Sequence, residues 1–150
     1  MRRITFFCIV LIVTSIAIWP QTFQPVVEQM GEPFSFVGMT LTELITRFGV
    51  PESVYTARGD EEWQDDVVFV YDAGDFYIFR DRVWQIGITS VYGIRTGDLK
   101  AVALLILGDE ARDMGDYILF RLHGSAWPLS LRVSIRDDRI SAIYIYRPDF

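Results

Sequence analysis

Three residue types that often build reactive sites are nearly missing from this chain of 150 residues, which has one cysteine (Cys8), one histidine (His123) and one lysine (Lys100). Cys8 lies in an apolar N-terminal run, so the remainder forms no disulfide and must be stabilised by its core. His123 has no cysteine or second histidine nearby, so a zinc ion lacks its usual ligands. We therefore expect no metal and no cofactor.

Positive charge is also scarce, because the chain carries a formal net charge of −6 at neutral pH. An acidic balance disfavours nucleic acid and anionic lipid surfaces as partners. The composition therefore predicts that no nucleic acid is bound.

A catalytic constellation is lacking as well. Ser125 has neither a glycine elbow nor a base partner. The adjacent carboxylates of Glu61 and Glu62 diverge on any regular element, and Asp72 and Asp75 are typical of a turn. We therefore predict that the protein is not an enzyme.

The N-terminus has the layout of an export segment. Arg2 and Arg3 precede an uncharged run from Ile4 to Trp19, and Pro20 ends it. As a helix this run is about 24 Å long, somewhat short for a hydrocarbon core of ~30 Å. Residues 1–20 are therefore either a cleaved signal sequence or a membrane anchor, and both alternatives stay open. The protein is expected to be exported, periplasmic or secreted, and to touch a membrane only through this segment if it is uncleaved.

Two stretches of sequence recur in the remainder. Residues 38–44 are echoed by residues 93–99, and residues 79–88 by residues 135–145. A recurring unit predicts a repeat architecture. We therefore expect a lead-in linker at 21–36, a first repeat at 37–92 and a second repeat at 93–150.

Each repeat is predicted to contain one helix followed by three strands. Thr40 and Glu43 form a capping box at the start of the first helix, and Gly49 closes that helix before Pro51. Residues 52–66 are polar, and Gly59-Asp60-Glu61-Glu62 within them are expected to form an exposed loop. The strands are expected at 67–71, 76–80, 83–89, 117–122, 129–135 and 140–146. The predicted fold class is α+β: two tandem helix-β-β-β repeats that form one antiparallel sheet of about six strands, with helices on one face.

Three motifs carry a resemblance to a known family: Gly38-Met39-Thr40 before the capped helix, Phe48-Gly49-Val50-Pro51 after it, and the hairpin turn Arg80-Asp81-Arg82-Val83. The chain resembles the SmpA/OmlA family of small outer-membrane assembly lipoproteins, and its doubling resembles the β-lactamase-inhibitor-protein architecture. It departs from the family because it has no lipobox, and because Arg95 stands where the first repeat has Thr40. The resemblance implies a non-catalytic envelope domain that binds another protein.

The open face of the predicted sheet is the candidate binding surface. If Ile143 and Ile145 face the helices, the residues that alternate with them face outward. The residues expected on this outward face are Tyr77, Phe79, Arg132, Ser134, Arg136, Tyr144 and Tyr146. Aromatic rings and arginines are enriched in binding hot spots. Two alternatives stay open: the rings simply cover the sheet, or the segment with Phe34 and Phe36 folds over them.

Tryptophans supply the remaining candidates. Trp63 and Trp127 are expected in loops and are secondary candidates for protein binding. Trp84 shares the predicted face of Ile86 and is expected in the core.

We therefore predict a non-catalytic protein-binding module of the cell envelope, with an envelope-assembly adaptor as the favoured form. Its partner is expected to be another envelope protein. The alternatives are a proteinaceous inhibitor of a secreted or periplasmic hydrolase and a structural stress protein without a single partner.

Overall fold

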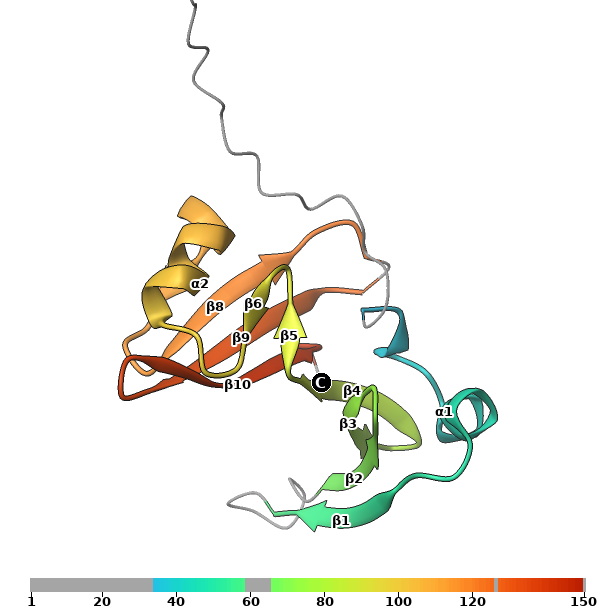
Figure 1. Ribbon diagram of the computed structural model, residues 1–150. Helices are drawn as coiled ribbons and strands as arrows, with labels where there is room; N and C mark the ends of the chain where they lie inside the picture. The colour runs from blue at the N-terminus through green and yellow to red at the C-terminus, as the bar shows by residue number, and fades with distance from the viewer. Residues whose placement is uncertain (1–33, 59–65, 126, 150) are drawn as a thin grey trace, which may run out of the picture.

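The structure is a computed structural model of the chain, and it describes residues 34–58, 66–125 and 127–149 (Figure 1). The predictions for residues 1–20, for most of the lead-in segment 21–36 and for Trp63 lie outside the described residues. Within the described ranges, no helix has the length and apolar character needed to span a membrane.

The described residues form mainly strands, and both α-helices are short. The elements follow in the order η1 (Phe34–Phe36), α1 (Leu41–Phe48), β1 (Ser53–Ala57), β2 (Asp66–Tyr71), β3 (Gly74–Phe79), β4 (Arg82–Ile88), β5 (Ser90–Val91), β6 (Ile94–Arg95), α2 (Lys100–Leu107), η3 (Gly108–Glu110), β7 (Arg112–Asp113), β8 (Tyr117–Leu122), β9 (Leu129–Arg136) and β10 (Arg139–Tyr146).

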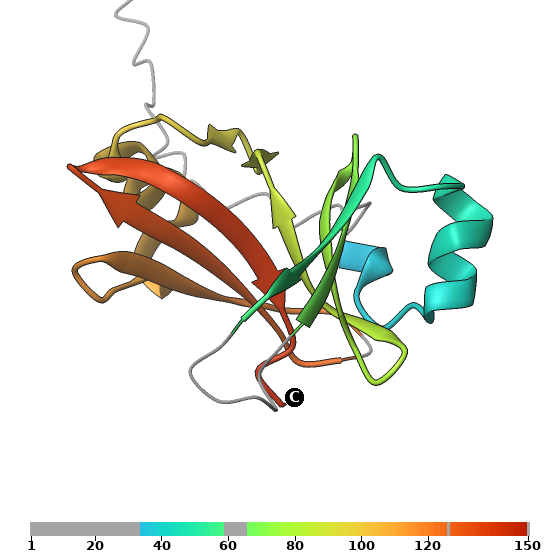
Figure 2. The same ribbon diagram turned by 90° about the horizontal axis from the view of Figure 1, so that it is seen from below.

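Eight of these strands form one antiparallel sheet in the order β1-β2-β3-β4-β10-β9-β8-β7, and β5 and β6 form a separate two-stranded ribbon. The halves of the sheet join where β4 pairs with β10, with Ile86 opposite Ile145 and Ile88 opposite Ile143. Figure 2 shows the β1–β4 half inclined to the β8–β10 half.

The predicted fold class is wrong. The protein is mostly β, with an eight-stranded sheet, a two-stranded ribbon and two short helices, and it does not consist of tandem helix-β-β-β repeats in a six-stranded sheet. One cause is β1, whose residues lie in a polar stretch where no strand was expected. Four of its five residues are exposed and the fifth is half-buried. Its sequence therefore lacks the alternation of buried and exposed residues by which a strand is recognised.

The core lies on one face of the sheet. Paired residues of antiparallel strands share a face, and the pairings link one row of apolar side chains across six strands. This row consists of Phe69, Phe76, Ile86, Ile145, Leu131 and Phe120. Leu44 of α1, Leu107 of α2 and Ile94 of β6 belong to the same buried cluster.

The segments that lead into the two helices are held to the sheet in the same way. In each, a glycine N–H donates to a strand carbonyl, and the glycine carbonyl accepts from an arginine Nη1. The four bonds are Gly38 N to Val83 O (2.7 Å), Gly97 N to Ile140 O (2.8 Å), Arg82 to Gly38 O (2.8 Å) and Arg139 to Gly97 O (2.8 Å). The structural counterpart of Gly38 is therefore Gly97, and not Gly93 as the sequence echo indicated.

The capping box of α1 is confirmed. The Glu43 N–H donates to the Thr40 hydroxyl oxygen at 3.2 Å, and the Thr40 N–H donates to a Glu43 carboxylate oxygen at 2.7 Å. The first helix begins at Leu41, directly after this cap, and ends at Phe48, where Gly49 with a φ of +79° closes it.

Candidate binding face and the Trp127 loop

The face of the sheet opposite the core carries a row of residues, one from each of seven neighbouring strands. The strands β1, β2, β3, β4, β10, β9 and β8 contribute, in this order across the sheet, Tyr55, Val68, Tyr77, Gln85, Tyr146, Ser130 and Arg121. It crosses about 29 Å of sheet at the usual spacing between strands. We call the side of the sheet that bears this row the open face.

A second row lies beside the first on the same face, two residues away along each strand. It contains Tyr144 and Arg132. Tyr144 pairs with Gly87 on one side and with Arg132 on the other. Gly87 in turn pairs with Asp75. A Cβ atom on Gly87 would lie 3.4 Å from Tyr144 Cε1 and 3.5 Å from the Asp75 Cβ. The Tyr144 ring therefore lies close over the bare backbone of Gly87 and beside Asp75.

Tyr77 is the best-enclosed phenol of the open face. Its ring meets that of Tyr144 edge-on, with the centroids 6.2 Å apart. Burial is the main cause that raises the pKa of the Tyr77 hydroxyl well above its ordinary value, and Tyr144 and a side-chain hydrogen bond with Tyr55 add to it. The phenol therefore stays protonated and is available as a hydrogen-bond donor or acceptor.

An acidic group lies at the same place. Asp75 is half-buried, and its burial raises the pKa of its carboxyl group. Neither Asp75 nor Tyr55 was among the predicted site residues. Asp75 was assigned to a turn, and Tyr55 lies in a strand that was not predicted.

Arg132 is held in place by an aromatic ring that the sequence analysis also missed. Its guanidinium carbon lies 4.4 Å from the centroid of Tyr117, on the neighbouring strand β8. Such stacking leaves the edge of the guanidinium group available for hydrogen bonds, and Arg132 is exposed. Tyr117 was missed because it is the first residue of a predicted strand, where the sequence gives little indication of the face to which the side chain points.

The structure brings only some of the predicted face residues together. Tyr77, Tyr144, Tyr146, Arg132 and Ser134 lie in neighbouring rows.

The other two predicted face residues lie apart from this group and from each other. Phe79 pairs with Arg82 beside the β3–β4 turn, and Arg136 pairs with Arg139 beside the β9–β10 turn. Because β4 and β10 run antiparallel, these turns lie at opposite ends of the sheet. No single patch can include both Phe79 and Arg136.

Trp84 does not share the face of Ile86, because a bulge interrupts β4. Tyr77 pairs with Gln85, and the next residue of β3, Ile78, pairs with Val83. Trp84 is thus the extra residue, and such an insertion breaks the alternation of faces. Val83 is fully buried, whereas Trp84 is half-buried and its indole N–H donates to Asp66 Oδ1 at 3.0 Å.

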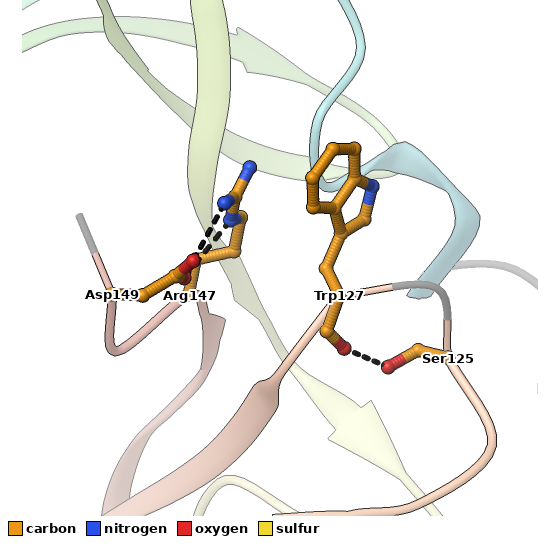
Figure 3. A network of polar contacts seen from close by, with 4 residues as sticks. All are labelled: Ser125, Trp127, Arg147 and Asp149. Atoms are coloured by element: carbon orange, nitrogen blue, oxygen red, sulfur yellow. Dashed lines mark hydrogen bonds and ion pairs between the residues drawn. The ribbon is translucent and has the colours of Figure 1, made fainter.

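Trp127 was predicted as a loop candidate for protein binding, and part of its ring packs against other residues of the fold (Figure 3). The guanidinium carbon of Arg147 lies 4.2 Å from its ring centroid, and Arg147 also forms two bonds to the Asp149 carboxylate, at 3.1 and 2.7 Å. On another side, a Cβ on Gly38 would lie 3.2 Å from the indole nitrogen. The Ser125 hydroxyl donates to the Trp127 carbonyl. Trp127 remains 47% exposed, so one part of the ring packs and another part is accessible.

The alternative that Phe34 and Phe36 cover the open face is not what the structure shows. Both rings are buried in the core cluster. Phe36 lies 5.8 Å from Phe76 and 5.1 Å from Phe48, between centroids, and Phe34 stacks on Tyr92 at 5.5 Å. These two residues therefore pack against the side opposite the tyrosine row.

Possible metal ligands do not gather in the described part of the chain. Among those residues, no group of three or more histidine, cysteine, aspartate or glutamate side chains lies close enough to hold a metal ion. His123 lies in the loop before β9, where its Nε2 is 3.4 Å from Glu110 Oε2 and both side chains are largely exposed.

Among the solved structures that match part of this chain are the following two. One is a cysteine-rich secretory protein from Staphylococcus aureus, with a TM-score of 0.49, 13% identity, and coverage of 80% of this chain and 47% of that one. The other is an extracellular protein containing an SCP domain from Bacillus anthracis, with a TM-score of 0.48, 12% identity, and coverage of 81% and 49%. This chain thus spans about half the length of each. No family model and no curated protein matches the chain.

The predicted resemblance to the SmpA/OmlA family and to the β-lactamase-inhibitor-protein architecture is therefore overturned. No family model matches, and the similar structures are described as proteins of another kind. The motifs behind the resemblance have local explanations in the capping box, the glycine helix end and the hairpin turn. At this level of similarity the two structures assign neither a partner nor an activity to this chain.

Proposed function

We propose that this protein is a non-catalytic, exported protein-binding module that holds its partner against the open face of its sheet. The observation that carries the proposal is the row containing Tyr55, Tyr77 and Tyr146, with Tyr144 and the exposed Arg132 beside it. Tyrosine and arginine are the residue types that contribute most to binding at protein interfaces.

The composition of this face supports binding better than a purely structural role. Most of the large, fully buried side chains belong to the core cluster on the other face, although Val68 and Ser130 of the row are also buried. Tyrosines, unlike phenylalanines, combine large apolar area with a hydroxyl group that can bond a partner. The Tyr77–Tyr144 contact and the Arg132–Tyr117 stacking reduce the freedom of these side chains before a partner arrives. A smaller loss of entropy on binding favours affinity.

Export is supported by the basic and apolar layout of residues 1–20. The partner is accordingly expected in the envelope or outside the cell. An assembly adaptor and a hydrolase inhibitor would both use such a face, and the identity of the bound protein separates them.

The test is site-specific photo-crosslinking in living cells. A photoreactive amino acid replaces Arg132 on the open face in one strain and Leu105, which is 77% exposed on α2, in a control strain. We expect one recurring adduct from position 132 and none from position 105. A Tyr144→Ala substitution, combined with the probe at position 132, should remove that adduct.

Two outcomes contradict the proposal: adducts of equal yield from both positions, or an adduct at position 132 that persists unchanged with Tyr144→Ala. Circular dichroism of each variant separates a lost contact from a lost fold. If the adduct contains a hydrolase whose activity falls in proportion to the bound chain, the module acts as an inhibitor.

A further inference from the structure

The β1 edge of the sheet has features that favour pairing with another strand. Among the described residues, β1 pairs with β2 on one side only. Its sequence, Ser53-Val54-Tyr55-Thr56-Ala57, contains no lysine, proline or other residue that usually protects an edge. Val54 and Tyr55 are 50% and 44% exposed. The opposite edge differs, because β7 is only two residues long and both residues, Arg112 and Asp113, are charged.

We propose that two copies of this chain pair through their β1 edges, antiparallel and related by a twofold axis through Tyr55. The proposal does not depend on the proposed function of the open face. It assigns the edge to one occupant, a second copy, on the basis of charge complementarity.

The axis must pass through a residue if the open faces of the two copies are to be continuous. Paired residues of antiparallel strands share a face, and faces alternate along each strand. A residue therefore pairs only with one of the same parity, which restricts the axis to Val54, Tyr55 or Thr56 near the centre of β1.

Charge selects Tyr55 among these three. With the axis at Tyr55, Glu52 of one copy lies opposite Arg58 of the other, and by symmetry this pair occurs twice. Val54 then lies opposite Thr56, which brings together two β-branched side chains suited to a sheet. With the axis at Val54 or Thr56, neither Glu52 nor Arg58 has an opposite charge across the pair. Opposite charges directly across antiparallel strands stabilise the pairing.

The surroundings of Glu52 support the same assignment. Glu52 shares a side-chain hydrogen bond with Asp72, and this carboxylate neighbour raises the pKa of Glu52. Two acids at this end of β1 therefore produce a concentration of negative charge. Arg58 of the second copy would lie beside it and reduce the repulsion.

The pairing has a consequence for the open face. Tyr55 belongs to the tyrosine row, so the two rows would meet at the axis, Tyr55 against Tyr55. The dimer would present one continuous row across both sheets and would double the surface offered to a partner.

Charge reversal in the full-length chain tests this register, with the oligomeric state measured by sedimentation velocity in detergent. Glu52→Arg places two arginines opposite each other at each end of the pairing, and Arg58→Glu does the same with two glutamates. Each single variant should weaken dimer formation on the order of tenfold or more, since like charges across strands repel. The double variant Glu52→Arg/Arg58→Glu should restore the dimer, and so should an equimolar mixture of the two single variants.

The mixture is the decisive sample, because only an intermolecular contact between positions 52 and 58 can be repaired by mixing. Asp109→Arg, an exposed change of the same size on η3, should leave the dimer unchanged. A monomeric wild-type chain overturns the proposal. So does a dimer that neither Glu52→Arg nor Arg58→Glu weakens, which would place the contact elsewhere, including the N-terminal apolar segment. Protection of the 53–57 amides from exchange only when a different protein is added would assign the edge to that protein instead.

Discussion

The rings of Tyr77 and Tyr144 meet edge-on at 6.2 Å and 79°, although they come from strands β3 and β10, which do not pair with each other. The strand between them is β4, and Gly87 supplies the space for the contact. A side chain at Gly87 would begin 3.4 Å from the Tyr144 ring. The absence of a side chain at one position of β4 thus lets the two halves of the sheet share one aromatic cluster on the open face.

The stability of the fold at alkaline pH should report on the burial of the Tyr77 hydroxyl. Burial raises the pKa of its phenol above the ordinary value of 10.0, so the unfolded chain loses this proton at lower pH than the folded chain does. The contribution to stability is therefore fully present below pH 10 and is lost as the pH rises above it. We expect the urea midpoint of the wild type to fall above pH 10, and to fall less in Tyr77→Phe.

Some alkaline dependence should remain in Tyr77→Phe, because burial also raises the pKa of Tyr71 and Tyr92. Absorbance of the phenolate near neutral and high pH provides an independent measurement. Identical midpoint curves for wild type and Tyr77→Phe would contradict the described environment of Tyr77.

Gly74 and Gly93 form a matched pair for a test of the sheet backbone. Both have positive φ, +139° and +84°, so alanine is strained at either position. At Gly74 a Cβ would also collide with the backbone oxygen of Gly87, while at Gly93 nothing lies within 4 Å. We expect Gly93→Ala to destabilise by about 1 kcal/mol and Gly74→Ala by about 3 kcal/mol or more.

Urea unfolding followed by circular dichroism measures both glycine variants. The informative quantity is the difference between them, since φ is positive at both positions but only Gly74 adds the collision with the Gly87 oxygen. Equal losses of stability would mean that the β3 and β4 backbones can move apart at little cost.

Several elements were predictable from the sequence because their signals are local. The capping box at Thr40 and Glu43 and the helix end at Gly49 depend on neighbouring residues and appear where expected. The strand Tyr117–Leu122 was expected with the observed bounds. These features follow from hydrogen bonds and φ values within a few residues.

Features that depend on distant partners were missed. β1 is a strand because β2 supplies its hydrogen bonds, and its own residues carry no buried face. The register shift at Trp84 is set by pairing across β3 and β4, and no local pattern marks it. Gly93 was taken as the counterpart of Gly38 because the residues that follow the two glycines are similar. The backbone hydrogen bond to Ile140 shows that Gly97 occupies the equivalent position. The sequence accordingly predicted the face of Tyr144 and missed Tyr55 and Tyr117.

The capping box of α1 should make stability depend on acidic pH. Hydrogen bonds from Thr40 lower the pKa of Glu43 below its ordinary value of 4.5. A lowered folded-state pKa means that the contribution is present above the unfolded pKa of 4.5 and is lost as the pH falls through the folded pKa. Glu43→Gln should therefore lower the urea midpoint at neutral pH, with the deficit shrinking in acid.

Thr40→Ala gives the size of the whole cap, and we expect it to cost about 1 kcal/mol at neutral pH. The N-cap residue of α2, Leu99, makes no side-chain cap bond, so Leu99→Ala serves as a control that should not reproduce this effect. A deficit of Glu43→Gln that stays constant down to strongly acidic pH would count against the bond between Glu43 and Thr40.

Trp127 and Arg147 offer a last test, because they join the β8–β9 loop to the segment after β10. Arg147→Ala removes the guanidinium group that lies over the indole ring. It also removes the two hydrogen bonds that this group donates to the Asp149 carboxylate. We expect a loss of about 1 kcal/mol in stability and a red shift of the Trp127 emission as water reaches the ring. Because the chain has four tryptophans, the Trp127 emission is obtained as the difference from the matching Trp127→Phe protein.

Asp149→Ala separates the two parts of the Arg147 contact. It removes the ion pair but keeps the guanidinium group that stacks on the ring, so its effect on stability should be smaller, and the Trp127 emission should change little. If Asp149→Ala shifts the emission as far as Arg147→Ala does, the carboxylate holds the arginine over the ring. In that case the C-terminal residues determine the position of the loop that presents the exposed half of Trp127.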